Sequence, residues 1–168
     1  MEDLQTPSPA KAALTPGLVG GILVMALYFV FYAIDPVHLV KPYRGLLTFA
    51  LAVTPLLVYG FKWRKEEMGG FATYGQSLQF AFVSLAITSL FGTLAQMLIF
   101  NVIDPKAAEF VAQKSLETIV DTMERFGQSS AMSSEDLTKL EEGTLEGLRP
   151  IGLLRGYGVG LLIDGFFA

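Results

Sequence analysis

The sequence predicts an all-α integral membrane protein: a four-helix transmembrane bundle with an amphipathic helical hairpin between the third and fourth spans. Three observations lead to this prediction. Hydrophobic residues make up 52% of the 168-residue chain, and its mean hydropathy of +0.48 exceeds what a soluble domain of this size requires. These residues form uninterrupted blocks instead of one apolar face per helix. The longest block, residues 68–103, carries no charged residue, and it exceeds the roughly 20 helical residues that cross a bilayer.

The composition excludes several kinds of site. The chain has no cysteine, so it has no disulfide, no thiol nucleophile and no Cys-ligated metal. A single histidine, His38, excludes a His-rich metal site. The net charge is −4 and no basic patch exists that could neutralise phosphates, so we expect no nucleic-acid partner. Without a nucleophile–base pair or a metal set, we expect no enzyme, no cofactor and no metal.

The first span is predicted over residues 17–34, after a flexible N-terminal tail over residues 1–16. The tail contains acidic residues and three prolines, and it lacks the basic start and apolar run of a signal peptide. Gly17 and Gly21 lie four residues apart and therefore share a face, where a second helix can approach closely. Asp35 is followed by proline, a pair that suits the end of a span and the start of a new helical turn.

The second span is predicted over residues 45–61, with a kink at Pro55. His38, in the loop before it, has two interpretations: a proton carrier, because the histidine pKa lies near neutrality, or a solvated interfacial side chain, which we favour. A basic cluster at 62–65 follows the span. Residues 68–79 are uncharged, polar and glycine-containing, and we expect an interfacial turn or a short surface helix there, since adding them to the third span would make it too long.

The third span is predicted over residues 78–103. Small and polar residues recur at every fourth position on it, which predicts a face for packing against another helix: Ser84, Thr88, Gly92 and Gln96. Gln96 and Asn101 are the two amides in the apolar part. An amide in lipid needs a partner, so each makes either a structural hydrogen bond between helices, which we favour, or a contact to a substrate.

Residues 104–149 form the extramembrane insert, with ten acidic and five basic residues. Apolar residues at helical spacing predict one amphipathic helix over about 105–126 and a second that starts after a turn at 127–134, capped by Ser133 or Ser134. Three acidic side chains suggest a calcium site: Glu141, Glu142 and Glu146. Because the spacing of an EF-hand is absent, we expect a solvated acidic face instead.

The fourth span is predicted over residues 151–168. Three glycines step by four along one face, which should pack on the small face of the third span: Gly152, Gly156 and Gly160. Arg155 and Asp164 are ionisable residues within this span, and such residues are candidate functional groups. They lie nine residues apart and point to opposite sides of a straight helix, so they cannot pair with each other. Their nearness to the ends of the span favours a position at the two interfaces.

Four spans place both termini and the basic cluster at 62–65 on one side of the membrane. Lysine and arginine near the span ends are equally numerous on the two sides. The compactness of the basic cluster and the acidity of the insert favour cytoplasmic termini under the positive-inside rule. The same layout puts both copies of the tripeptide Ile-Asp-Pro, at 34–36 and 103–105, on the opposite side.

The region from 62 to 105 resembles a known family. Its motifs follow in order: a basic loop, Gly69-Gly70-Phe71, Tyr74-Gly75-Gln76-Ser77, a long span, and Ile103-Asp104-Pro105 before a Glu/Lys-rich helix. This order resembles small four-helix membrane proteins that are grouped as a domain of unknown function and occur mainly in Bacteroidota. The resemblance covers residues 17–168 and implies a bacterial inner-membrane location with the same four-span layout. It transfers no catalytic residues. Members of the family usually end in a basic tail, and the end at Ala168 departs from this.

Two functions fit these features. The first is a non-enzymatic accessory or scaffolding subunit of a bacterial inner-membrane complex, or a small homo-oligomer, surrounded by membrane lipid. It would bind other subunits or itself through the glycine-rich faces and the amphipathic insert. The alternative is a small transporter or channel component. This alternative requires four residues to line one polar path: Gln96, Asn101, Arg155 and Asp164.

Overall fold

The computed structural model describes residues 8–125 and 134–167, and every element in these ranges is a helix. Three stretches are long and apolar enough to cross a membrane: Pro9–Ile34, Pro42–Glu66 and Tyr74–Ile103. This confirms the all-α class, and the three apolar stretches are consistent with a membrane protein. The fourth predicted span corresponds to a shorter apolar helix, α7 (Pro150–Phe167).

The first membrane helix begins before the predicted boundary at residue 17. A short helix, α1 (Pro9–Ala12), leads into α2 (Leu14–Ile34), so residues 9–12 and 14–16 are helical. Pro9 and Pro16 both fall in a first helical turn. Proline is tolerated there because the backbone N–H that it lacks has no partner within the helix in any case.

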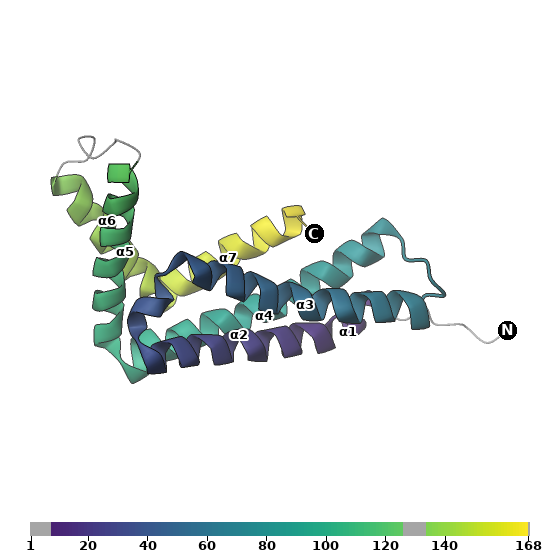
Figure 1. Ribbon diagram of the computed structural model, residues 1–168. Helices are drawn as coiled ribbons and strands as arrows, with labels where there is room; N and C mark the ends of the chain where they lie inside the picture. The colour runs from purple at the N-terminus through teal and green to yellow at the C-terminus, as the bar shows by residue number, and fades with distance from the viewer. Residues whose placement is uncertain (1–7, 126–133, 168) are drawn as a thin grey trace.

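Both Ile-Asp-Pro tripeptides end one helix and start the next. After α2, the Asp35 carboxylate accepts a hydrogen bond of 2.8 Å from the Val37 backbone N–H and caps the short helix η1 (Pro36–Leu39). Asp104 follows η2 (Ile99–Ile103), and its carboxylate accepts from two backbone N–H groups at the start of α5 (Pro105–Arg125). η1 packs against α5, so the two copies lie at the same end of the molecule (Figure 1).

The connection between α3 (Pro42–Glu66) and α4 (Tyr74–Leu98) corrects the expectation for residues 68–79. Only the part before Tyr74 is a turn, with positive φ angles at Gly69 and Gly70. Thr73 begins α4 with a capping box: its hydroxyl accepts from the Gln76 N–H, and the Gln76 side-chain oxygen accepts from the Thr73 N–H. This local cap extends the helix at the N-terminal end of the predicted third span. The stretch Tyr74–Ile103 has 30 residues, about 45 Å at 1.5 Å per residue, so it exceeds the hydrocarbon core and its ends reach beyond it.

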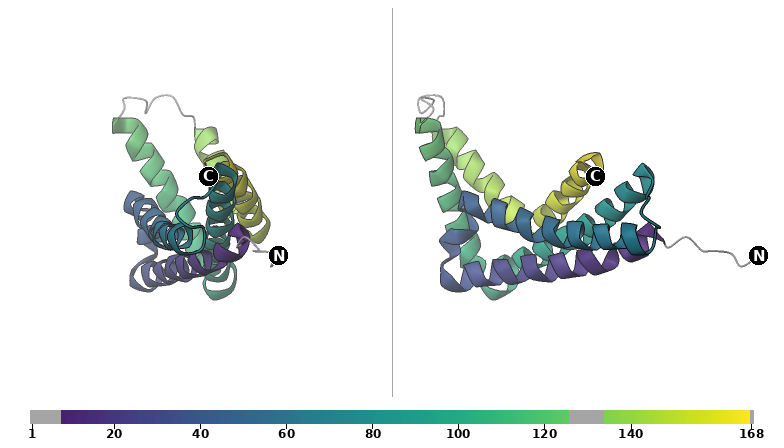
Figure 2. Two further views of the ribbon diagram at one scale, coloured as in Figure 1. Left: turned by 90° about the vertical axis from the view of Figure 1, so that its right-hand side faces the viewer. Right: turned by 45° about the vertical axis from the view of Figure 1, so that its right-hand side comes forward.

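The insert is a pair of helices, α5 and α6 (Ser134–Leu148), that stands at a steep angle to the spans (Figures 1 and 2). The two helices pack against each other, and α6 is followed directly by α7. The predicted cap at Ser133 and most of the predicted turn at 127–134 lie outside the described residues.

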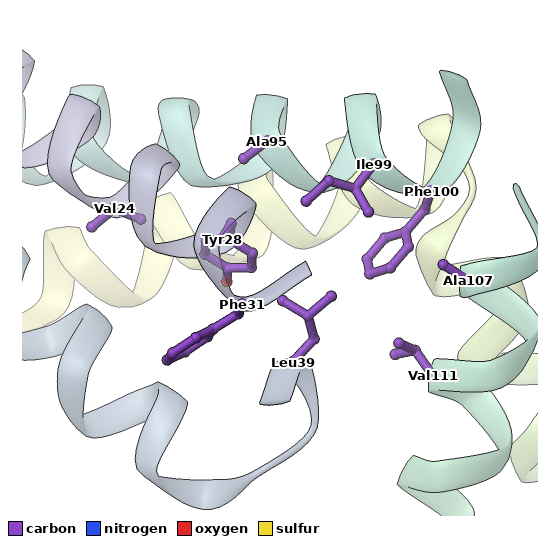
Figure 3. Close-up of a cluster of buried hydrophobic side chains, with 9 residues drawn as sticks. All are labelled: Val24, Tyr28, Phe31, Leu39, Ala95, Ile99, Phe100, Ala107 and Val111. Carbon is purple, nitrogen blue, oxygen red and sulfur yellow. The ribbon is translucent and has the colours of Figure 1, made fainter. Parts of the chain in front are cut away.

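The main hydrophobic core lies where α2, η1, the end of α4 and α5 meet (Figure 3). Leu39 and Ile99 are its two largest fully buried side chains, with 2% and 0% of their surface exposed. This core joins the base of the hairpin to the spans. A second cluster, at the opposite end, stacks Trp63 on Phe80 with 5.0 Å between ring centroids. α3 continues through Pro55 and leaves most of its large apolar side chains exposed, as a lipid-facing helix does.

Candidate functional site

The glycine face of α2 packs tightly on the small-residue face of α4. A Cβ at Gly17 would lie 2.9 Å from Ile87 Cβ and 3.0 Å from the Ser84 carbonyl oxygen. A Cβ at Gly21 would lie 2.8 Å from the Phe91 ring. The Thr88 hydroxyl donates a hydrogen bond of 3.2 Å to the Gly17 carbonyl. Both faces thus serve close helix packing, and each is the partner of the other.

This pairing corrects the expectation that α7 would cover the small-residue face of α4. Ser84 and Thr88 are buried, and a Cβ at Gly92 would lie 3.3 Å from Val24 Cγ1 and 3.9 Å from Tyr28 Cε2, both of α2. A single helix face accommodates one close neighbour, and α2 occupies it with its own glycines. α7 packs on α4 along a different side.

The three glycines of α7 have two different roles. A Cβ at Gly152 would lie 2.1 Å from the Glu146 carbonyl oxygen, so this glycine permits the sharp corner between α6 and α7. Gly156 and Gly160 have nothing within 4 Å of the Cβ position. These two glycines therefore border open space.

The open space is a groove of about 770 Å³ between α3 and α7, floored by α4. Its volume lies within the usual range for ligand pockets, roughly 300–1,000 Å³. α7 packs on α4 and α6, while α3 packs mainly on α2, so the groove separates two helices that diverge (Figure 2). The side chains that border it come from five helices: Val24, Tyr28, Arg44, Thr48, Phe49, Ala52, Val53, Leu85, Thr88, Ser89, Thr93, Gln96, Leu153 and Tyr157, with glycines at 45, 92, 147, 152, 156 and 160.

The hydroxyl groups on the floor of the groove already donate hydrogen bonds within the protein. Ser89 donates to the Ala86 carbonyl at 3.2 Å, and Thr93 donates to the Ser89 carbonyl at 3.0 Å. The hydroxyl of Tyr157, on α7, donates to the same Ala86 carbonyl at 3.2 Å. Because these donors are used, the floor of the groove does not require a hydrogen-bond acceptor from an occupant.

The end of the groove nearest the hairpin is polar. The Arg44 guanidinium lies 5.6 Å from the centroid of the Tyr28 ring, a cation–π contact. No carboxylate lies within 4 Å of this guanidinium in the part of the chain that the structure describes. Gln96 donates to the Gly92 carbonyl at 3.3 Å, and the Thr48 hydroxyl is buried without a hydrogen-bond partner.

The second span predicted from residue 45 leaves Arg44 in the loop before it. The structure begins α3 at Pro42, so Arg44 lies in the first helical turn and borders the groove. The signal that could have shown this is the proline itself, since proline is favoured at the first position of a helix.

The four predicted intramembrane polar residues do not share one cavity. Gln96 borders the groove. Asn101 donates a hydrogen bond of 3.1 Å to the Leu148 carbonyl and borders a separate cavity of about 230 Å³. Arg155 is exposed and lies outside the groove. Position 164 is helical, and the side chain of Asp164 is outside the described part of the chain.

Asn101 lies in the π-helical turn η2 and connects the spans to the hairpin. Its amide donates both to the Met97 carbonyl in its own helix and to the Leu148 carbonyl at the end of α6. The last carbonyls of a helix lack partners within the helix, so this amide satisfies one of them. A π turn inserts one extra residue into the helix and is common at functional positions.

The remaining candidates are also located. His38 is half-buried, where its Nδ1 pairs with the Tyr43 hydroxyl and its ring lies 5.8 Å from that of Phe31. Glu142 and Glu146 are exposed, and Glu141 is half-buried. No group of three or more His, Cys, Asp or Glu side chains that could hold a metal occurs within residues 8–125 and 134–167.

Comparison with known proteins gives one result. The family model described as "Protein of unknown function (DUF4199)" matches residues 15–167. Neither the curated proteins nor the solved structures include a match to this chain. The matched region contains α2 from Thr15 onward, α3, α4, both hairpin helices, α7 and every residue that borders the groove.

Proposed function

The chain belongs to the DUF4199 family of proteins of unknown function, and on this premise we propose that it is a non-enzymatic, four-span accessory or scaffolding subunit of a bacterial inner-membrane complex. The three long apolar helices support the membrane location. α7 serves as the fourth span: its 18 residues correspond to about 27 Å of helix, close to the hydrocarbon thickness of about 30 Å. It runs back along α4 toward the end of the molecule where α2 begins (Figure 1).

In this arrangement the termini and the cluster at 62–65 are cytoplasmic, and the hairpin is on the outer face. The order of the helices supports it, because α2, α3, α4 and α7 alternate in direction (Figure 1). The basic cluster carries Lys62, Arg64 and Lys65 at the end of α3, all exposed. Lysine and arginine near span ends are enriched on the cytoplasmic side.

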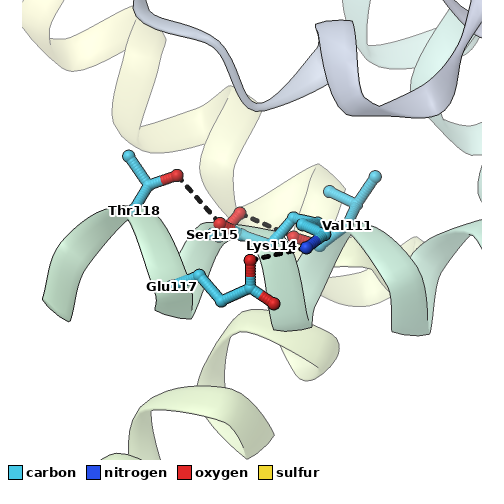
Figure 4. Close-up of polar contacts among 5 residues, drawn as sticks. All are labelled: Val111, Lys114, Ser115, Glu117 and Thr118. Carbon is cyan, nitrogen blue, oxygen red and sulfur yellow. Dashed lines mark hydrogen bonds and ion pairs between the residues drawn. The ribbon is translucent and has the colours of Figure 1, made fainter. Parts of the chain in front are cut away.

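The projecting hairpin carries the proposal. In the described part of the hairpin, the base contacts the spans through the buried core at Ala107 and Val111 and through the Asn101 hydrogen bond. Further along α5, the hydroxyls of Ser115 and Thr118 donate to carbonyls of their own helix, and Lys114 pairs with Glu117 at 2.6 Å (Figure 4). The polar side of α5 is thus bonded within the helix, and the outer part of the hairpin is available to a protein partner.

Site-specific photo-crosslinking in cells would test this role. A photoreactive residue would replace Thr122 of α5 or Lys139 of α6, both exposed on the hairpin, and Glu67 at the opposite end would serve as the matched control position. We expect one discrete crosslinked protein from the two hairpin positions and none from position 67. A native mass measurement in mild detergent that gives a clean monomer, together with no crosslink from either hairpin position, would contradict the proposal.

Transport has less support as a second function. Of the four residues that it requires, Gln96 borders the groove, whereas Asn101 holds the hairpin and Arg155 is exposed elsewhere. The floor hydroxyls of the groove are bonded to backbone carbonyls and leave no continuous row of free polar groups. Flux in proteoliposomes that is lost in Gln96→Leu would restore this hypothesis.

A further inference from the structure

We propose that the groove between α3 and α7 binds one anionic phospholipid from the leaflet on the hairpin side. Its phosphate would lie at Arg44, and one acyl chain would lie along the floor of α4. This inference rests on the four-span placement in the proposed function and adds the class of ligand. The hairpin and its partner play no part in it, so the two proposals can fail separately.

The groove extends through half of a bilayer. Its border on α3 runs from Arg44 to Val53, and its border on α7 runs from Gly152 to Gly160. At 1.5 Å per helical residue these stretches measure about 13 Å and about 12 Å. One leaflet contributes about 15 Å to a hydrocarbon core of about 30 Å. A groove of this length, with its polar end at the hairpin side, matches a single lipid of that leaflet.

The deep part of the groove is chemically suited to an acyl chain. Phe49, Val53 and Leu85 line it with apolar side chains. The hydroxyls of Thr88, Ser89 and Thr93 are bonded to carbonyls of α4 itself and do not require water or a polar ligand. On the α7 side, Gly156 and Gly160 have no side chains, so the groove is wider there than it would be with larger residues.

The polar end is suited to a phosphate. The Arg44 guanidinium lies over the Tyr28 ring, 5.6 Å from its centroid. A guanidinium presents its N–H groups as a planar fork that matches a phosphate in a bidentate manner. Lys41 and Arg149 are exposed at the same end of the spans. The nearby carboxylates of Asp35 and Asp104 accept backbone hydrogen bonds as helix caps. In the described part of the chain no carboxylate lies within 4 Å of the Arg44 guanidinium, so the charge at this end of the groove favours an anionic headgroup over a zwitterionic one.

Native mass spectrometry of the full-length protein in detergent, with added lipid, would test the inference. The probes are dioleoyl phosphatidylglycerol, dioleoyl phosphatidylethanolamine with the same chains, and glycerol phosphate, which is a soluble anion without chains. The variants are Arg44→Gln, which removes the charge, and Gly156→Leu, which fills open space in the groove. Arg64→Gln removes an exposed charge at the opposite end and is the matched control.

We expect the wild type to retain phosphatidylglycerol about tenfold more than phosphatidylethanolamine, as one charge-assisted contact would produce. Arg44→Gln should lower phosphatidylglycerol to the level of phosphatidylethanolamine, Gly156→Leu should reduce both lipids, and Arg64→Gln should change neither. The inference would be overturned if Arg44→Gln retained as much phosphatidylglycerol as the wild type does. It would also be overturned if Gly156→Leu retained as much of both lipids as the wild type does. If glycerol phosphate bound as strongly as phosphatidylglycerol, the groove would be a site for a soluble anion and the lipid proposal would be wrong.

Folding of each variant is checked by its helical circular dichroism and by a single elution peak in detergent. Gly160→Leu, one turn deeper and also in open space, provides a second variant if Gly156→Leu does not fold.

Discussion

At the scale of single residues, the neighbours of each glycine determine what a larger side chain would do. Gly17 and Gly21 allow contact between two spans, Gly152 allows a chain corner, and Gly156 borders the groove. In sequence these positions look alike, because each belongs to a series spaced by four. The contacts separate them into positions that forbid a Cβ atom and positions that tolerate one.

Gly152→Ala should destabilise the protein strongly. The new Cβ would lie 2.1 Å from the Glu146 carbonyl oxygen, which is a backbone atom and cannot move without opening the corner between α6 and α7. We expect a loss of at least about 2 kcal/mol, in the range typical of overpacking and backbone strain. Unfolding by sodium dodecyl sulfate, followed by circular dichroism, measures this loss.

Gly156→Ala is the matched control, one turn further along α7. Its Cβ has nothing within 4 Å, and alanine has a higher helix propensity than glycine by about 1 kcal/mol. This variant should be as stable as the wild type or more stable. Equal losses in Gly152→Ala and Gly156→Ala would show that the tight corner does not exist.

Gly17→Ala should weaken the contact between α2 and α4. Its Cβ would lie 2.9 Å from Ile87 Cβ and 3.0 Å from the Ser84 carbonyl oxygen, so the two helices must move apart. We expect a loss of about 1–3 kcal/mol in the same detergent titration. Gly45→Ala, at an open position in α3, should show no loss. Full stability of Gly17→Ala would contradict the pairing of these two faces.

At the scale of elements, helix ends determine the architecture more than the spans themselves do. Asp35 and Asp104 each stop a membrane helix and cap the next one. The capping box at Thr73 makes α4 start at Tyr74, before the predicted start of the third span at residue 78. Asn101 satisfies a carbonyl at the end of α6 and so sets how the hairpin joins the bundle.

Asn101→Leu should loosen the hairpin from the spans. The substitution keeps the side-chain size and removes the donor to the Leu148 carbonyl, and such bonds in membrane proteins contribute about 0.6 kcal/mol on average. We expect a small loss of global stability and a clear increase in amide hydrogen exchange at the end of α6. Gln113→Leu, at an exposed position of α5, should leave the exchange unchanged. Unaltered exchange in Asn101→Leu would show that this hydrogen bond does not hold the hairpin.

At the scale of the whole molecule, three helices form a packed unit and the fourth diverges from it. α2 packs on both α3 and α4, and α3 also contacts α4, while α7 contacts α4 and α6. The groove exists because α3 and α7 border the same side of α4 without closing on each other. The hairpin then extends the molecule at the end where the groove is polar.

Labelling of single cysteines should report four spans. The chain contains no cysteine, so each introduced one is unique. In intact cells, a membrane-impermeant maleimide should label Gly143→Cys, on the hairpin, and should label Glu66→Cys and Ala168→Cys only after permeabilisation. Labelling of Ala168→Cys together with Gly143→Cys in intact cells would mean that α7 does not cross the membrane.

The site was predicted less completely than the fold. The apolar blocks located the helices within a few residues because a span needs a certain length of apolar chain, wherever its neighbours are. The helix α1 at Pro9–Ala12, the first residues of α2 and the extension of α4 to Tyr74 were not predicted. Proline positions and a capping box act locally, whereas the prediction relied on the composition of long blocks. The groove was missed because it depends on which helices diverge, and residue spacing carries no such information.

The hydrophobic pattern of the sequence was enough to indicate an all-helical chain with apolar helices of membrane-crossing length, to locate them, and to place an acidic helical insert between α4 and α7. Burial in lipid and backbone hydrogen bonding impose these features on any chain with this hydrophobic pattern. Only the tertiary structure decided which small-residue faces pair, that Gly156 and Gly160 face open space, and that Arg44 borders it. A glycine face can pack closely against any of several helices, and which one it packs against depends on the contacts of the whole bundle.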